Sequence, residues 1–341
     1  MLGQLHGGRI DPCQAAHWAL SLGLDQAVRQ RLEAPKGRAQ LSAEQRRGLG
    51  FRIARTTEPF VAHQHLLAPS RQRELQSRWK RLRKNSSPIR VALHGGIGDH
   101  LQDLSALVPW LRDQHQAFMV HFESGRMAQF DRLLKSIAPE GEITCEALFR
   151  DEGLHVLEAL ALLGTQVLQP RAWIDLQRPQ HTPFQLLCCW GAIGQGDRFS
   201  AWSRSVPFAA VQRLYDDLLG HGWPAAAIVD ITAWKPWEAA TLRQLGVQLV
   251  NPAAGDVLDL AQLVNRCQQV VSIDTALVHL CAAMGQPVHL LLPRFYDERW
   301  FELLQPGSSY AACCQVLRQE TFGNWESELR ALRAGLCPAG P

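Results

Sequence analysis

Short apolar runs and helical spacings of apolar residues alternate along the chain from residue 89 onward. Residues 89–93 form an apolar run that predicts a buried strand, and glycines lead from it into a helical spacing over 100–114. A second apolar run at 118–122 predicts the next strand, and a helix is expected over 125–136. Strand, glycine turn, helix and strand in this order are typical of the opening of a doubly wound α/β domain.

The stretch after residue 150 has a weaker pattern, for which we expect a helix over 154–163 and a strand over 172–176. A second unit begins at Phe184, where a run that predicts a buried strand leads to Gly191. Further strands are predicted at 226–229, 247–250, 269–273 and 287–293, and helices at 208–219, 258–265 and 276–284. Two such α/β units, facing each other across a cleft, suit a protein that brings a donor and an acceptor together.

Residues 1–87 have a different character, that of helices and loops without the fixed period that helical repeats would show. The polar sequence Asn85-Ser86-Ser87-Pro88 then breaks the pattern. We therefore predict three parts: a helical basic extension at 1–87, an α/β domain at 88–183 and a second α/β domain at 184–335.

Length and composition agree with this organisation. A chain of 341 residues is expected to form about two domains, and 46% hydrophobic with 20% charged residues is ordinary for a soluble globular protein. No apolar run approaches the roughly 18 residues of a membrane-spanning helix. Residues 1–12 lack the apolar core of a secretory signal, so a cytoplasmic location is expected.

Basic charge is concentrated near the N-terminus. The whole chain carries a net charge of +3, but residues 1–90 hold 17 Lys and Arg against 6 Asp and Glu. The basic stretch 71–84 has helical character and could make a peripheral contact with an anionic membrane surface. A solvated helix face is the simpler interpretation. No nucleic-acid partner is expected.

The nine cysteines predict neither a disulfide framework nor a zinc site. Their number is odd, no C-x-x-C occurs, and two pairs, Cys188-Cys189 and Cys313-Cys314, are adjacent in sequence. Most lie in apolar stretches, which favours buried free thiols.

The first candidate site is the sequence Gly95-Gly96-Ile97-Gly98-Asp99 between the first strand and its helix. Glycines there allow a close approach of backbone and ligand, and a helix N-terminus favours anions. However, Asp99 places a carboxylate where a dinucleotide phosphate would sit, and the spacing departs from the G-x-G-x-x-G of dehydrogenases. Asp99 could accept a proton from a substrate hydroxyl, or it could only cap the helix, and the spacing leaves both open.

The second candidate site lies in the second α/β unit, where a strand ends in Asp274 and Thr275 and a helix begins. The first free N–H groups of this helix belong to Thr275, Ala276 and Leu277, and they could cradle a diphosphate. His279 lies one turn further on, on the same face as Thr275. The alternative is an ordinary capped helix with His279 in the core.

The third candidate site is the loop 194–207, which contains Asp197, Arg198, Arg204 and Ser205. An arginine that precedes a helix and follows a glycine-rich loop can clamp a phosphate. The alternative is a surface arginine without a ligand.

Taken together, these segments resemble the heptosyltransferase-like glycosyltransferases of family nine, and most closely the subgroup usually attached to tetratricopeptide repeats. The resemblance covers roughly residues 89–330. It departs from the family at 1–87, where repeats are not recognisable, and at Arg204, which is a lysine in classical heptosyltransferases. The residues that carry it are Gly98-Asp99-His100, Trp190-Gly191, Asp197-Arg198, Arg204-Ser205-Val206-Pro207, Val271 to Ala276, His279-Leu280, Ala283 to Val288, Leu291-Leu292-Pro293, Asp297, Arg299-Trp300, Leu317-Arg318-Gln319 and Trp325.

The resemblance implies a bacterial protein of the two-domain GT-B fold. It also implies an inverting, metal-independent transfer of a hexose or heptose from a nucleotide-diphosphate sugar to an acceptor hydroxyl. By the same resemblance Asp99 would be the general base, with Gly96, Gly98 and His100 beside it on the acceptor side. Backbone dipoles and arginine would neutralise the leaving diphosphate, so no metal or other cofactor is expected. The donor would be held by Arg204, Ser205, Asp274, Thr275, Ala276, Leu277 and His279.

Other functions remain open at this stage. The chain could be a non-catalytic protein that binds a sugar nucleotide and acts as a scaffold, or a GT-B sugar epimerase that needs no acceptor. A nicotinamide dehydrogenase is a more distant alternative. The sequence does not determine the donor sugar, its nucleotide, or whether the acceptor is a glycan, a lipid-linked molecule or a protein.

Overall fold

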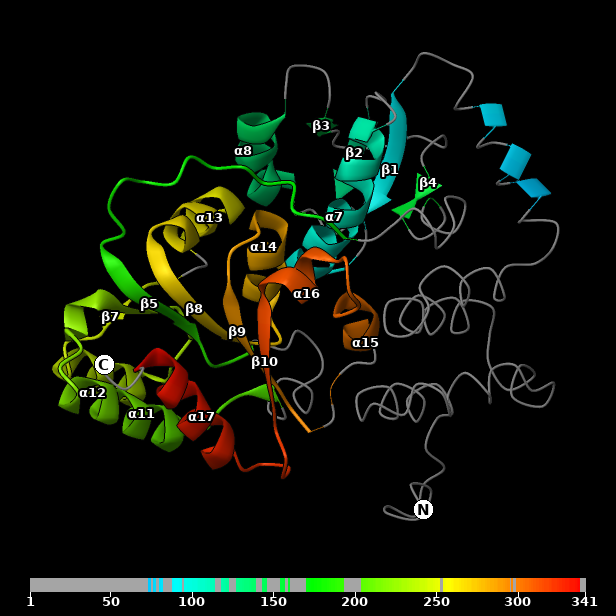
Figure 1. The fold of residues 1–341 in the computed structure, drawn as a ribbon. Coiled ribbons are helices and arrows are strands. Elements are labelled where there is room, and N and C mark those ends of the chain that lie inside the picture. The colour runs from blue at the N-terminus through cyan, green and yellow to red at the C-terminus, as the bar shows by residue number, and fades with distance from the viewer. Residues whose placement is uncertain are drawn as a thin grey trace, which may run out of the picture.

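The structure, a computed structural model, describes most of the chain after residue 87 and only short pieces before it (Figure 1). The predicted helices of the extension 1–87 therefore lie outside the described residues, apart from a few helical positions. The described ranges are 73–74, 76–77, 80–81, 88–93, 95–113, 118–122, 127–138, 143–145, 154–156, 159, 170–192, 204–251, 254–294, 296 and 299–337.

The first of two parallel sheets has four strands in the order β3-β2-β1-β4. The strands predicted at 89–93 and 118–122 are confirmed and pair in register, with Ile89 opposite Phe118. Two helices accompany this sheet. The elements are β1 (Ile89–Leu93), α7 (Ile97–Asp113), β2 (Phe118–Phe122), α8 (Met127–Ile137), β3 (Ile143–Cys145) and β4 (Leu154–His155).

The second parallel sheet has six strands in the order β10-β9-β8-β5-β6-β7. The α/β class with parallel sheets is thus confirmed. The elements are β5 (Phe184–Cys189), α11 (Phe208–Gly220), β6 (Ile228–Asp230), α12 (Pro236–Gln244), β7 (Gln248–Leu249), α13 (Val257–Asn265), β8 (Cys267–Ile273), α14 (Ala276–Met284), β9 (Val288–Leu292), α15 (Arg299–Leu303), α16 (Ser309–Cys313), β10 (Cys314–Arg318) and α17 (Glu326–Leu336).

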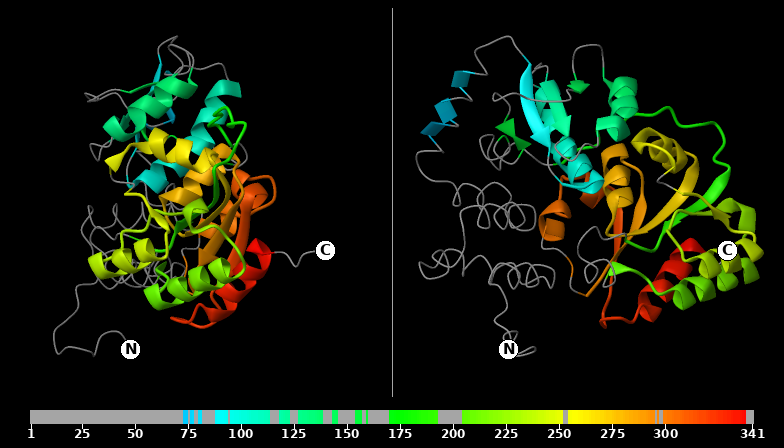
Figure 2. Two further views of the ribbon diagram at one scale, coloured as in Figure 1. Left: turned by 90° about the vertical axis from the view of Figure 1, so that its left-hand side faces the viewer. Right: turned by 180° about the vertical axis from the view of Figure 1, so that it is seen from behind.

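The central strands of the second sheet are buried on both faces. Along β5, Leu187 and Cys189 join the apolar cluster under α13 and α14, while Leu186 and Cys188 join the cluster under α11 and α17. Figures 1 and 2 show these helix pairs on opposite sides of the sheet. A strand covered on both faces needs apolar side chains at successive positions, which is why the last four residues of β5, 186–189, are apolar and buried.

A layer of helices joins the two sheets. Helix α7 of the first sheet packs on α14 of the second, and α8 packs on α13 (Figure 2). One hydrophobic cluster runs through this layer and includes residues of both sheets, such as Val91, Leu104 and Leu290. The two units therefore share a core where their helices meet. The predicted division into domains at 88–183 and 184–335 stays a prediction.

One predicted element starts later than expected and another is wrong. The helix expected over 154–163 is preceded by strand β4, whose Leu154 pairs with Val91 of β1, and its described positions Val156 and Ala159 are helical. The strand expected over 172–176 has no regular structure. Its apolar residues Trp173 and Ile174 are buried because they pack at the end of α14, where both N–H groups donate to the carbonyl of Ala283, at 2.8 and 2.9 Å.

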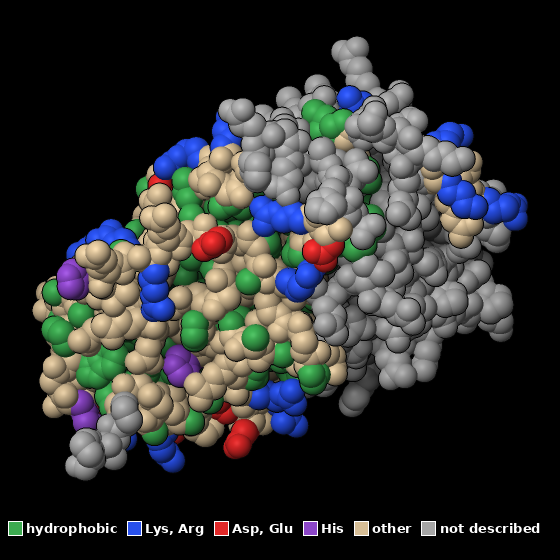
Figure 3. Space-filling model, turned by 45° about the horizontal axis from the view of Figure 1, so that its top comes forward, with side chains coloured by type: hydrophobic (Ala, Val, Ile, Leu, Met, Phe, Trp, Pro, Cys, Tyr) green, Lys and Arg blue, Asp and Glu red, His purple; other side chains and the backbone are tan. Residues whose placement is uncertain are grey.

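The described part of the basic stretch 71–84 is helical and exposed at Arg73, Lys80 and Arg81. Figure 3 shows a group of Lys and Arg side chains at the right-hand edge of the face that it presents. Among the described residues, none of the helices has both the length and the apolar character needed to cross a membrane. Peripheral contact of this stretch with a membrane stays a prediction.

Candidate functional site

The second sheet reverses its winding between β5 and β8, which are neighbours in the sheet although other strands separate them in sequence. The helix after β5 leads to β6 on one side, and the helix after β8 leads to β9 on the other. Open parallel sheets bind ligands beyond the carboxyl ends of the strands at such a switch point. Here those ends are Cys189 and Ser272, which are paired in register.

Helix α14 begins at this edge without a side-chain cap. Thr275 occupies the N-cap position, with φ −142° and ψ 176°, but its hydroxyl makes no bond to the first turn. It contacts the hydroxyl of Ser272 at 3.0 Å and the thiol of Cys189 at 3.8 Å instead. The ordinary capped helix that the sequence left as an alternative is therefore not found at Thr275, whose side chain makes no capping bond. The N–H groups of Ala276 and Leu277 are not capped by that hydroxyl, which suits an anion at the N-terminus of the helix.

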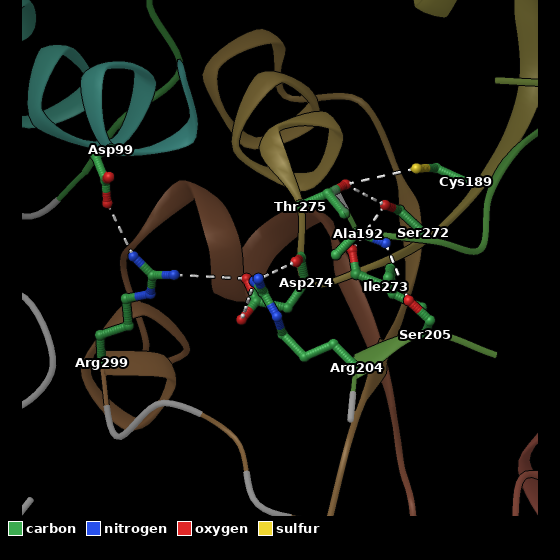
Figure 4. Close-up of polar contacts among 10 residues, drawn as sticks. All are labelled: Asp99, Cys189, Ala192, Arg204, Ser205, Ser272, Ile273, Asp274, Thr275 and Arg299. Carbon is green, nitrogen blue, oxygen red and sulfur yellow. Dashed lines mark hydrogen bonds and ion pairs between the residues drawn. The ribbon is translucent and has the colours of Figure 1, made fainter. Parts of the chain in front are cut away.

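The loop before α11 returns to the same edge. Arg204 donates from Nη1 to the carbonyl oxygen of Asp274 at 2.9 Å, and the same nitrogen lies 3.6 Å from the Asp274 carboxylate (Figure 4). The hydroxyl of Ser205 accepts a hydrogen bond from the N–H of Ala192 at 3.1 Å. The structure thus brings Arg204 against Asp274, and the predicted donor-binding roles of Arg204 and Ser205 stay predictions.

A buried hydrogen-bond network connects the elements next to this edge. The carboxylate of Asp230, at the end of β6, accepts hydrogen bonds from the hydroxyl of Tyr215 at 2.8 Å and from the N–H of Thr232 at 2.7 Å. Trp190 in turn donates to the Tyr215 hydroxyl at 2.7 Å. Burial raises the pKa of Asp230, partly offset by these hydrogen bonds. The network ties β6 and α11 to the end of β5, and the sequence analysis did not identify it.

Asp274 is a buried carboxylate between two arginines. Only 2% of the residue is exposed. Burial alone would raise its pKa, but the surrounding positive charges, those of Arg299 and Arg204 first, outweigh burial, and the pKa is lowered. Its Oδ1 atom is buried and lies 3.6 Å from Nη2 of Arg299. Asp274 is therefore an ionised carboxylate held by two arginines at the switch point.

The first sheet has its own switch point at β1, with β2 on one side and β4 on the other. Gly95 follows β1 with φ +115°, a backbone conformation that suits glycine. The N–H of Gly96 then donates to Oδ2 of Asp99 at 2.8 Å, in the first turn of α7. The helix-capping interpretation of Asp99 is confirmed by this bond, while its role as a base stays a prediction.

One arginine links the two switch points. Nη1 of Arg299 donates to Oδ1 of Asp99 at 3.2 Å, and its Nη2 lies 3.6 Å from Oδ1 of Asp274 (Figure 4). The first candidate site and the second are thereby in direct electrostatic contact. Sequence reasoning gave Arg299 no role, because the residue is 200 positions from Asp99 and its local pattern carries no sign of the contact.

The two predicted histidines lie in the core. His279 is 1% exposed, its Nδ1 is 2.8 Å from the hydroxyl of Tyr310, and its ring stacks on Trp300. The core interpretation of His279 is thus confirmed, and a direct contact with a donor stays a prediction. His100 is also buried, with its ring edge-on to Phe122.

At Gly98, helix α7 approaches α14 closely. A Cβ atom placed there would lie 2.7 Å from Cδ2 of His279 and 3.4 Å from Cα of Ala276. The close neighbour of this glycine in the structure is the helix of the second unit, and the predicted close approach of a ligand stays a prediction.

Some residues of the predicted features lie outside the described residues, namely Asp197, Arg198 and Asp297. Within the described part of the chain, His, Cys, Asp and Glu side chains form no group of three or more that could hold a metal ion. The described cysteines that can be assigned are free thiols, as expected. Burial raises the pKa of the Cys189 thiol, beside Thr275, to about 11.

Comparisons with known proteins give structural matches alone. No protein-family model matches the chain, and no curated protein matches it. Among solved structures, the E. coli ADP-heptose LPS heptosyltransferase II is 14% identical, with 73% of this chain and 99% of that chain covered and a TM-score of 0.48. The E. coli heptosyltransferase WaaC with ADP is 16% identical, with 73% and 99% covered and a TM-score of 0.43. A family 9 glycosyl transferase from Veillonella parvula is 12% identical, with 68% and 86% covered and a TM-score of 0.40.

Proposed function

We propose that this protein is an inverting, metal-independent glycosyltransferase, which moves a hexose or heptose from a nucleotide-diphosphate sugar to an acceptor hydroxyl. The donor binds at the edge formed by β5 and β8, and the acceptor binds beside the first turn of α7. The observation that carries the proposal is the ion-pair chain from Asp99 through Arg299 to Asp274, because it joins a candidate base to a candidate anion site.

The donor half has the chemistry that a nucleoside diphosphate requires. The start of α14 offers N–H groups that the Thr275 hydroxyl does not cap, and Arg204 adds a full positive charge within hydrogen-bond distance of Asp274. Helix N-termini and guanidinium groups both stabilise phosphate oxygens. The buried Asp274 holds Arg204 at this edge through its backbone carbonyl.

The acceptor half supplies a partly exposed carboxylate. Asp99 accepts a hydrogen bond from the N–H of Gly96 on one oxygen and from Arg299 on the other. Its side chain is 25% exposed, whereas Asp274 is almost fully buried. Asp99 is therefore the carboxylate of the pair that an acceptor hydroxyl can reach.

In the proposed reaction the acceptor oxygen attacks the anomeric carbon as its proton passes to Asp99. The bond between that carbon and the diphosphate oxygen breaks, and the nucleoside diphosphate leaves with the electron pair. Arg204 and the N–H groups at the start of α14 stabilise the charge that develops on this leaving group. The product sugar has the opposite anomeric configuration because the displacement occurs in one step.

The first prediction concerns the base. Asp99→Asn removes the proton acceptor but keeps the side chain's shape, so turnover should fall by about 10²–10⁴-fold. Binding of the nucleoside diphosphate should persist, because the donor half is unchanged. The measurement is release of nucleoside diphosphate from ADP-, UDP- and GDP-hexoses and ADP-heptose, together with calorimetric titration of ADP, UDP and GDP.

The outcome also separates the alternatives. Wild-type turnover in Asp99→Asn would remove Asp99 from the mechanism. Binding without turnover of any donor in the wild type would indicate a scaffold that holds a sugar nucleotide. Conversion of the donor alone to an epimer would indicate an epimerase.

A further inference from the structure

A single guanidinium lies between the two carboxylates of the proposed site. Arg299 lies in α15, after the strand β9 and outside both strand-end motifs. Its side chain is 13% exposed, so it is held within the protein rather than extended into solvent. Figure 4 shows one nitrogen directed at Asp99 and the other at Asp274.

The two contacts of Arg299 are not equivalent. Its distance to Asp99 is 3.2 Å and meets the criteria of a hydrogen bond. Its distance to Asp274 is 3.6 Å, an ion pair without a hydrogen bond. Arg204 instead makes its hydrogen bond on the donor half, where it donates to the backbone carbonyl of Asp274 at 2.9 Å. The two arginines are thus divided, with Arg204 on the donor half and Arg299 chiefly on the acceptor half.

Arg299 and Gly96 together fix the plane of the Asp99 carboxylate. One oxygen is bound by the N–H of Gly96 at 2.8 Å and the other by Arg299. Two donors on different oxygens prevent rotation of the carboxylate about its Cβ–Cγ bond. A catalytic group held in one orientation reacts faster, because the cost of orienting it is met before the substrate binds.

We propose that Arg299 is a positioning residue that orients Asp99 toward the donor half. The inference rests on the proposed function, because it gives Arg299 its role through the base. Arg299 also offsets the repulsion between Asp99 and the buried charge of Asp274, and so lets two carboxylates face one site. Its contribution belongs to turnover, whereas that of Arg204 belongs to donor affinity.

The test compares Arg299→Met with Arg204→Met. Arg299→Met should lower turnover by about 10²-fold, the effect of a misplaced catalytic group. Its dissociation constant for the nucleoside diphosphate that the wild type binds among ADP, UDP and GDP should stay within about threefold. Arg204→Met should instead weaken that binding by about tenfold or more, because it removes a charge-assisted contact. Arg299→Lys, which keeps the charge, should recover part of the turnover.

A matched control is available in Arg132. This arginine also joins the two units through carboxylates, those of Asp256 at 3.0 Å and Asp259 at 3.1 Å, but it connects α8 to α13 and its side chain is 55% exposed. Arg132→Met should change neither turnover nor binding. An equal loss in Arg132→Met would mean that any bridge between the units has the effect, and it would overturn the specific role of Arg299.

A double-mutant cycle provides the sharper test. If Arg299 acts through Asp99, then adding Arg299→Met to Asp99→Asn should cause no further loss of turnover. Independent, multiplicative losses would overturn the proposal, as would a binding defect in Arg299→Met equal to that in Arg204→Met. If Arg299→Met does not fold by thermal melting, Arg299→Gln and Arg299→Lys replace it in the same cycle.

The two proposals can fail separately. Loss of turnover in Asp99→Asn with wild-type turnover in Arg299→Met would overturn the role of Arg299 and leave the proposed function standing. A wild-type protein that binds none of the three nucleoside diphosphates and hydrolyses none of the donors would overturn both.

Discussion

At the scale of the residue, the glycines around Asp99 matter because they have no Cβ atom. A Cβ atom at Gly95 would lie 2.5 Å from Oδ2 of Asp99, and one at Gly98 would collide with His279. The absence of a Cβ atom at Gly95 leaves room for the Asp99 carboxylate. Its absence at Gly98 lets α7 and α14 pack closely. The local sequence thus prepares both the orientation of Asp99 and its proximity to the second unit.

The prediction at this scale is that Gly98→Ala destabilises the protein. His279 is confined by Tyr310 and Trp300, so it cannot move away from a Cβ atom at 2.7 Å. Overpacking of this kind costs about 1–3 kcal/mol, measurable by chemical denaturation. Gly220→Ala is the control, because a Cβ atom there meets no neighbour within 4 Å, and it should be neutral or stabilising by up to about 1 kcal/mol. Equal effects of the two changes would contradict the argument.

At the scale of the element, α14 lies at the donor edge with its N-terminus and binds residues of the first unit at its C-terminus. Its N-terminus opens at the donor edge, and its last turn accepts the N–H groups of Trp173 and Ile174. Gly285 ends the helix in the left-handed conformation, with φ 67°, as glycine commonly does. The side of α14 between these ends packs on α7, so the proposed donor site is anchored directly to the first unit.

The prediction at this scale is that apolar burial, and not the surface ion pairs, holds α8 in place. Leu133 is fully buried in the shared core, so Leu133→Ala should cost about 2–5 kcal/mol in the free energy of unfolding. Arg132→Met, one position earlier, should change that free energy little, because its exposed ion pairs are screened by water and salt. Chemical denaturation in low and high salt checks both variants. A larger loss in Arg132→Met would reverse the assignment.

At the scale of the whole molecule, the continuous cluster between the sheets couples their stability. Residues of α7 and β1 belong to the same buried cluster as residues of α14 and β9. Unfolding either unit would expose the apolar helix face of the other. The two sheets should therefore behave as one cooperative structure in their common core.

We expect peptides from β1 and β8 to exchange their amide hydrogens with the same dependence on denaturant. The reason is that buried residues of both strands, Val91 of β1 and Val270 of β8, belong to the same hydrophobic cluster. Hydrogen exchange followed by mass spectrometry measures this strand by strand. Protection lost from β1 well before β8 would show that the units unfold independently, as separate domains would.

The sequence by itself determined the elements whose burial follows from apolar runs and periodicity. The strands β1, β2 and β8 and the helix α14 follow from apolar runs and periodicity, because the buried positions of a strand or helix must be apolar. It also located the polar residues at strand ends, Asp99 and Asp274, because strand ends of parallel sheets gather at one edge.

Only the tertiary structure decided which of these polar residues lie close together. The short edge strand β4 depends on pairing with β1, and residues 172–176 satisfy their backbone on α14 instead of in a sheet. Arg299 contacts Asp99 across 200 positions only because the helix layer brings α7 and α14 together. A local pattern records what each residue must bury, but a contact between distant charges depends on how the buried faces pack.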